Sequence, residues 1–175
     1  MVQDILISWG TMLMPFQDIP ATHAYFKQIQ RVALAGVMVG DWPISSEPAL
    51  LPLFSPDARV TVQQGAVFVA RALGLLPMAP TADLTDDDPL PYLAPYGITI
   101  ADPQAFLTGE VFISWLERLP LTLQSNKPSR DYELKAMPLQ GPLTRARLAA
   151  ALDRCFDTFY TVPPRPIADI LPAGL

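Results

Sequence analysis

Residues 16–41 read FQDIPATHAYFKQIQRVALAGVMVGD, and they form the most strongly patterned stretch of the chain. The stretch opens with a turn, and its middle carries apolar residues at helical spacing: Tyr25, Ile29, Val32 and Ala33. Glycine often follows the last turn of a helix, because it adopts the left-handed conformation that such an end requires. We therefore predict a helix between Thr22 and Ala35, with Gly36 as its stop.

Three further helices are predicted from their first residues, Thr61, Thr108 and Thr144. A threonine hydroxyl can accept a hydrogen bond from a free amide of the first helical turn, and Gln64 can complete a capping box with Thr61. Each threonine follows a proline-containing turn that ends in an apolar residue: FSPDARV, ADPQAFL and LQGPL. This recurrence indicates an internal repeat.

Each of these helices carries apolar residues on one face. The three sets are Ala66, Val69, Ala70 and Leu73; Phe112, Trp115, Leu116 and Leu119; and Leu148, Leu152, Cys155 and Phe159. We predict a mainly α fold in which these faces meet in a central three-helix bundle. The chain has 20 prolines among its 175 residues, well above the usual share of about 5%, so long proline-rich loops should join the helices.

The repeat divides the chain into regions. A helix is expected upstream of each capped helix, and the segment from Asp83 to Gly97 parallels that from Asp18 to Gly36. We predict a lead-in helix over 1–15 that continues from a larger parent chain, a module over 16–160, and a proline-rich tail over 161–175. The module has three imperfect units at about 16–75, 81–119 and 129–160.

Composition excludes several classes of partner. The formal charge is −5, and the 12 Lys and Arg residues form no basic stripe, which argues against nucleic acid and anionic membranes. The apolar runs are shorter than the roughly 20 residues that span a bilayer. The first 15 residues lack the basic start of a signal peptide, and a single cysteine, Cys155, excludes an internal disulfide.

The patterned stretch resembles the S-layer homology (SLH) family. Its motif combines an F-x-D-I turn, a histidine that begins a helix, a Gly-aliphatic pair, an F-x-P turn and a capped T-R-A-E helix. The matching residues are Phe16, Asp18, Ile19, His23, Ile29, Gly36, Val37, Gly40, Phe54, Pro56 and Thr61. Residues 16–75 match well, and the second and third units match in part.

The resemblance implies three motifs around a central helical bundle, which hold a bacterial surface protein on acidic cell-wall polysaccharide. It also implies a location in the cell envelope or outside the cell. In the family, the arginine of T-R-A-E contributes to the grip on the acidic sugar. Its position is held here by Val62, Gly109 and Arg145, and the family's tryptophan after the histidine is replaced by Ala24.

A second resemblance is to SLH-like extensions at the C-terminal end of bacterial FAD-dependent oxidoreductases, which use phrases similar to residues 14–40. It implies a catalytic flavin domain upstream of Met1 and a docking role for this chain. The parent protein or a second copy would then be the partner. We expect no cofactor in this fragment, because no G-x-G-x-x-G turn is present.

The candidate ligand-binding residues are Arg145, Trp42 and His23. Arg145 lies in a first helical turn, where the dipole disfavours a cation, so a partner anion is expected, either an internal carboxylate or a ligand. Trp42 follows a turn in a proline-rich loop and suits an exposed contact, whereas Trp115 is expected in the core. His23 suits a polar structural role better than that of a general base, which needs an orienting carboxylate.

Two other groups of residues have a simple structural interpretation. Asp86, Asp87 and Asp88 lack the glycine and distal glutamate of an EF-hand loop, so a solvated turn before a helix is favoured over a calcium site. Cys155 lies on an apolar face and is expected to be a buried filler. We predict no catalytic or metal-binding residues.

Overall fold

The computed structural model describes residues 14, 16–41, 52–77, 88–119 and 139–156. This part of the chain is mainly helical and contains no β-strand, only isolated β-bridges. Its elements in order are α2 (Phe26–Leu34), α3 (Val62–Ala72), α4 (Leu90–Leu93), the 3-10 helix η2 (Ala94–Tyr96), α5 (Gly109–Arg118) and α7 (Arg145–Phe156). The predicted mainly α fold class is confirmed.

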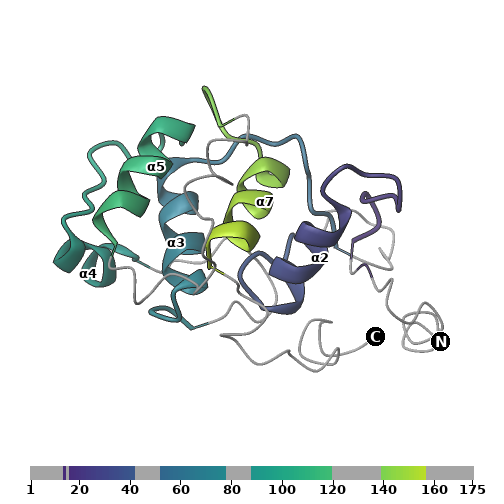
Figure 1. Cartoon of the computed structure of the whole chain (residues 1–175), viewed down its shortest axis with the longest axis horizontal. Helices are drawn as coiled ribbons and strands as arrows, with labels where there is room; N and C mark the ends of the chain where they lie inside the picture. The colour runs from purple at the N-terminus through teal and green to yellow at the C-terminus, as the bar shows by residue number, and fades with distance from the viewer. Residues whose placement is uncertain (1–13, 15, 42–51, 78–87, 120–138, 157–175) are drawn as a thin grey trace.

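The helices pack side by side around one hydrophobic core. Helix α7 contacts α2 on one side and α3 on the other, and α3 also contacts α4 (Figure 1). Helix α3 is buried along nearly its whole length, from Gly65 to Ala72, as expected for a helix with neighbours on several sides. Trp115 and Cys155 are 4% and 2% exposed, so both belong to the core as predicted.

The predicted threonine caps are present at all three helix starts. The Thr61 hydroxyl accepts from the Gln64 N–H at 3.2 Å, and the Gln64 side chain accepts from the Thr61 N–H at 3.0 Å, which completes the capping box. Thr108 accepts from the Val111 N–H at 3.4 Å. The third cap links the Thr144 hydroxyl to the N–H of Arg147 at 3.3 Å.

A closed ring of backbone hydrogen bonds joins the residues that precede these threonines. The Val60 N–H donates to the Leu143 carbonyl at 3.0 Å, Leu143 donates to Leu107 at 2.8 Å, and Leu107 donates back to Val60 at 2.8 Å. All three residues are fully buried. Segments far apart in the sequence therefore fix one another at the start of α3, α5 and α7.

Helix α2 and the α4–η2 segment end in the same way. After α2, the Gly36 N–H donates to Ala33 and the Val37 N–H donates to Val32, both at 2.9 Å, which is the Schellman pattern. After η2, Gly97 and Ile98 repeat this pair of bonds. Gly36 and Gly97 have φ values of 72° and 73°, so each stop requires a residue that adopts the left-handed conformation without strain.

The first predicted helix is shorter in the structure. Helix α2 begins at Phe26 rather than Thr22, because Ala21–Tyr25 form turns and the Tyr25 N–H donates to the His23 side chain. The helix predicted between Asp83 and Gly97 is present as α4, which passes into η2, where Pro95 can donate no backbone hydrogen bond. The lead-in region 1–13, Trp42, Phe159, the upstream part of the third unit and the tail lie outside the described residues.

No helix within the described ranges is both long and apolar enough to cross a membrane.

Candidate functional site

Arg145 is buried at the start of α7 rather than exposed in a groove. Its side chain is 5% exposed, and its Nε donates to the Phe54 carbonyl at 2.6 Å. The guanidinium carbon lies 4.9 Å from the centre of the Phe54 ring and 5.6 Å from that of Phe68. A carbonyl and two aromatic faces therefore stabilise the cation that the helix dipole disfavours.

Phe54 connects Arg145 to the opening turn. Its N–H donates to Asp18 Oδ1 at 2.8 Å, and the next N–H, that of Ser55, donates to Asp18 Oδ2 at 2.7 Å. The Phe54 ring also packs against Phe16, with 5.0 Å between ring centres. Asp18 thus joins the F-x-D-I turn to the F-x-P turn, and charge-assisted bonds of this kind are among the stronger ones in proteins.

Gly109, which the SLH resemblance places opposite the motif's arginine, has no room for a side chain. A Cβ built on Gly109 would lie 1.3 Å from the Leu139 carbonyl oxygen. Gly109 also donates its own N–H to the Gly141 carbonyl at 3.0 Å. Close approach of two backbones thus accounts for glycine at this position.

The first amides of α3, α5 and α7 already have internal acceptors. The N–H groups of Val62, Gly109 and Arg145 donate to the carbonyls of Ala105, Gly141 and Ala58 at 2.8, 3.0 and 2.9 Å. The threonine hydroxyls accept from the third amide of each helix. Free amides at a helix start commonly bind anions, so these hydrogen bonds make the three starts poor anion sites.

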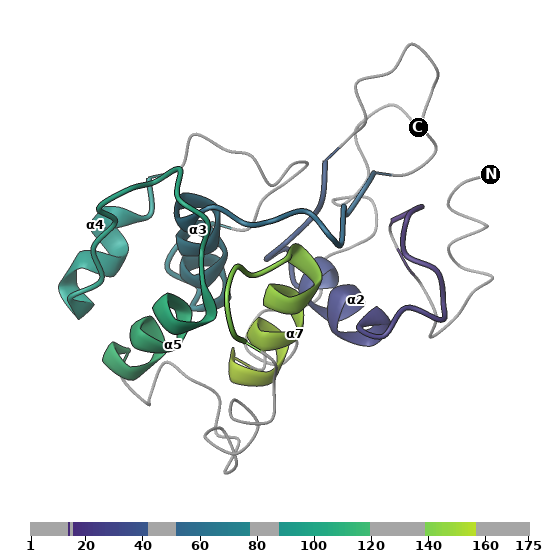
Figure 2. The same cartoon turned by 90° about the horizontal axis from the view of Figure 1, so that it is seen from above.

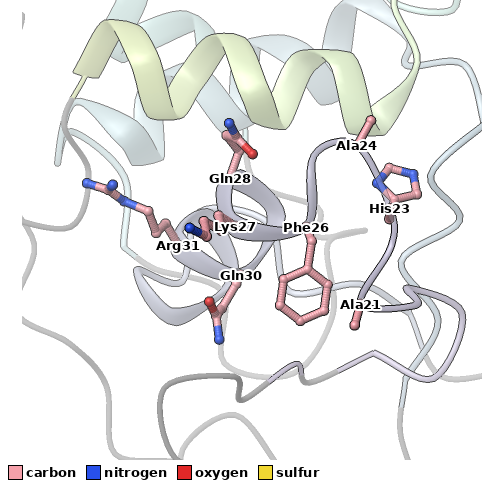
Figure 3. Close-up of a pocket in the computed structure, with 8 residues that line it drawn as sticks. All are labelled: Ala21, His23, Ala24, Phe26, Lys27, Gln28, Gln30 and Arg31. Atoms are coloured by element: carbon pink, nitrogen blue, oxygen red, sulfur yellow. The ribbon is translucent and has the colours of Figure 1, made fainter.

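A cavity of about 680 Å³ lies along α2 and the turn before it. This α2 cavity has a volume within the range of small-molecule sites. The described residues that line it are Ala21, His23, Ala24, Phe26, Lys27, Gln28, Gln30 and Arg31. Figure 3 shows these side chains around the helix, with Gln28 directed toward α7 and His23 in the preceding turn.

Of the two sequence-predicted site residues that the structure describes, His23 lines the α2 cavity. Its Nδ1 accepts from the Tyr25 N–H at 3.1 Å, so the neutral ring carries its proton on Nε2. The imidazole thus stabilises the turn before α2 and retains one donor. Arg145 is not among the lining residues, so the structure does not bring these two candidates together at the cavity.

One of the residues that line the cavity, Arg31, forms an ion pair with α7. Arg31 Nε lies 3.0 Å from Asp153 Oδ1, and the two side chains are 36% and 7% exposed. Since Asp153 is in α7, the pair joins α2 to α7 beside the cavity. Lys27 precedes Arg31 by four residues and therefore lies on the same side of the helix.

The remaining sequence predictions concern metals and Trp42. Asp88 Oδ1 accepts from the Leu90 N–H at 3.0 Å, which is a turn contact before α4, while Asp86 and Asp87 lie outside the described residues. Among the residues that the structure describes, no group of three or more potential metal ligands comes together. Trp42 also falls outside the described ranges.

Sequence reasoning missed Lys27 and Arg31. Both are visible in the sequence as basic residues four apart on a predicted helix, on the side away from the apolar residues Ile29, Val32 and Ala33. A charged helix face is usually only solvated, and the sequence alone could not show that a cavity lies over this one.

Comparison with protein-family models, with curated proteins and with solved structures gives no match for the chain.

Proposed function

We propose that this chain is a noncatalytic binding module of a larger bacterial protein, which it attaches to cell-envelope glycan. The α2 cavity is the observation that carries the proposal. Its lining combines the donors and acceptors of His23, Gln28 and Gln30 with the ring of Phe26. A sugar presents hydroxyl groups and apolar C–H faces together. The polar side chains of the cavity suit the hydroxyl groups, and the Phe26 ring suits the C–H faces.

The module consists of three SLH-like units around a central bundle of α3, α5 and α7. Two observations support this arrangement: the closed ring at Val60, Leu107 and Leu143, and the threonine cap on each helix. Viewed from above, α3, α5 and α7 lie at the corners of a triangle (Figure 2). Each unit would then contribute one helix to the centre.

The position of His23 supports a noncatalytic role. In a catalytic triad, a carboxylate contacts Nδ1 and orients the ring. Here Nδ1 accepts a backbone N–H, and both carboxylate oxygens of nearby Asp18 accept from Phe54 and Ser55. The groups that could have formed a general base therefore have structural partners.

A second candidate is docking against a parent protein, such as the upstream flavin domain of an oxidoreductase. Two large exposed side chains favour it: Tyr92 and Phe106 are 42% and 48% exposed, and exposed aromatic residues are enriched in protein interfaces. The test is the reading frame before Met1. A flavin-binding pattern there would support docking, and its absence would eliminate the oxidoreductase hypothesis.

Sedimentation with purified bacterial cell-wall glycan tests the first candidate. We expect the chain in the pellet, and we expect soluble wall polysaccharide to release it. His23→Asn keeps an acceptor for the Tyr25 N–H but removes the imidazole, so it should reduce pelleting several-fold without changing Tm. Gln104→Ala, at an exposed position outside the cavity, is the matched control and should pellet like the unaltered chain. A chain that remains in the supernatant with every glycan preparation would contradict the proposal.

A further inference from the structure

His23 is the only histidine of the chain, and both its backbone and its side chain hold the turn before α2. Its N–H donates to the Pro20 carbonyl at 2.9 Å, and its carbonyl accepts from the Phe26 N–H at 3.0 Å. Its Nδ1 accepts from the Tyr25 N–H at 3.1 Å. The two backbone bonds do not depend on pH, whereas the third requires that Nδ1 carry no proton.

This side-chain acceptor makes the start of α2 different from the other capped helix starts. Helices α3, α5 and α7 begin at Thr61, Thr108 and Thr144, whose hydroxyls are uncharged acceptors in both neutral and acidic solution. The N-cap of α2 is Tyr25, whose side chain makes no cap hydrogen bond. The turn before α2 thus depends on histidine, the side chain that ordinarily changes charge between about pH 5 and 8.

Protonation of His23 would place two donors against each other. Both ring nitrogens of an imidazolium carry a proton, so an Nδ1–H would face the Tyr25 N–H across 3.1 Å. The ring must then turn away, and the Tyr25 N–H loses this acceptor. Because Ala21, His23 and Ala24 line the α2 cavity (Figure 3), a rearranged turn changes one wall of the cavity.

The charges that line the cavity beside His23 oppose an added proton. The described lining contains two cations, Lys27 and Arg31, and no carboxylate, and like charges disfavour the charged form of a histidine. The Tyr25 ring lies 6.2 Å from the imidazole between ring centres, and its phenol carries no charge in neutral or acidic solution. The surroundings of the ring therefore suit the neutral imidazole.

Two carboxylates of neighbouring segments have other partners. Asp18, five residues before His23, accepts from two backbone N–H groups of the F-x-P turn. Helix α7, which packs against α2, carries one carboxylate, Asp153, which pairs with Arg31 at 3.0 Å. The other charged side chains of α7 are cations: Arg145, Arg147 and Arg154.

We propose that His23 is a proton switch for the turn before α2, which is closed while the imidazole is neutral and opens when the imidazole is protonated. In mildly acidic solution, the opened turn weakens glycan binding at the α2 cavity. This second part rests on the proposed function, whereas the first concerns the turn alone. Because the folded chain holds the neutral imidazole, the unfolded chain binds more protons, and stability falls as the pH falls through the range in which histidine titrates.

Nuclear magnetic resonance of the whole chain, labelled at nitrogen, tests the switch without a ligand. At about pH 7.5, above the ordinary histidine range, the imidazole should be the Nε2–H tautomer. At about pH 5, hydrogen exchange of the Tyr25 amide should be about two- to tenfold less protected, which is the usual contribution of one hydrogen bond to an equilibrium. An Nδ1–H tautomer, or equal protection at both pH values, overturns the proposal.

Two variants at this position separate protonation of the ring from other effects of acid. Asparagine keeps an acceptor for the Tyr25 N–H and does not titrate, so His23→Asn should protect this amide equally at both pH values. Alanine offers no acceptor, so His23→Ala should show in neutral solution the weaker protection that the unaltered chain shows in acid. A loss in acid that persists in His23→Asn would belong to another group and would overturn the proposal.

Sedimentation with cell-wall glycan at the same two pH values tests the effect on binding. The unaltered chain should bind about two- to tenfold more weakly in acid, and His23→Asn should bind equally at both pH values. Equal binding by the unaltered chain, with an opened turn, would overturn control of the cavity and leave the switch itself in place. If the chain does not sediment even at neutral pH, the proposed function fails, and the amide measurements still decide whether the switch exists.

Discussion

At the scale of single residues, Gly109 gives the sharpest prediction. Its missing side chain lets the Leu139 carbonyl approach α5, and a Cβ there would lie 1.3 Å from the carbonyl oxygen. Backbone cannot move aside as a flexible side chain can, so Gly109→Ala should cost at least about 3 kcal/mol, the upper part of the range for overpacking. Urea denaturation followed by circular dichroism measures this cost.

Gly74 provides the control for this substitution. It has a φ of 70°, but no atom lies within 4 Å of a Cβ built on it. Gly74→Ala should therefore cost only the strain of a left-handed residue, about 1–2 kcal/mol. Equal costs for the two variants would mean that the close approach at Gly109 does not limit packing.

Arg145 and Gly109 show which contacts can be predicted from the sequence and which cannot. A cation in the first turn of a helix led us to expect an anion beside Arg145, because the dipole effect is local. The described contacts are the Phe54 carbonyl and the rings of Phe54 and Phe68, and the anion stays a prediction. The sequence could not identify Phe54 and Phe68 as partners, because Phe54 is 91 positions away. Likewise, nothing near Gly109 in the chain indicates that Leu139 lies against it.

At the scale of elements, Glu110 stabilises the start of α5. Hydrogen bonds from its own backbone N–H, from the Thr108 hydroxyl and from the Gly141 N–H lower the pKa of Glu110. A carboxyl whose folded pKa lies below its unfolded value adds stability above the unfolded value, and this stability is lost as the pH falls through the folded pKa. The side chain is exposed, so the effect should be small.

Glu110→Gln should therefore flatten the decline of stability in acid. We expect the midpoint of urea denaturation to fall less steeply below about pH 4.3, the ordinary pKa of glutamate, than in the unaltered chain. Glu117→Gln removes the same charge from the other end of α5 and should leave the steep decline in place. Parallel pH profiles for all three proteins would show that Glu110 contributes nothing to the acid response.

Elements were the level at which the sequence was most informative. Threonine caps and glycine stops depend on groups within a few residues of each other, so Thr61, Thr108, Thr144 and Gly36 could be assigned from local pattern alone. The start of α2 was placed four residues too early, because the His23 side chain takes the Tyr25 N–H and favours turns there. Local spacing does not reveal such competition.

At the scale of the whole molecule, the closed ring determines how the parts depend on one another. Each of Val60, Leu107 and Leu143 donates to one member of the ring and accepts from the other. Removing any one segment would leave a buried donor and a buried acceptor without partners, at about 1–3 kcal/mol for each group. The sequence predicted three similar helix starts. It could not predict the ring, because the ring depends on how these distant segments meet in the folded chain.

This dependence predicts that α5 and α7 unfold together. In a chain with Trp9→Phe and Trp42→Phe, fluorescence reports only on Trp115, which is buried in α5, while the thiol reactivity of Cys155 reports on α7. If the ring makes these helices one cooperative body, both signals and far-UV circular dichroism should share a single urea midpoint. Earlier exposure of Cys155, with Trp115 still buried, would show that α7 separates on its own, and the ring would then not couple the two helices. The assay discriminates because each probe is a single residue in a different helix, so a common midpoint cannot arise from two signals that follow the same helix.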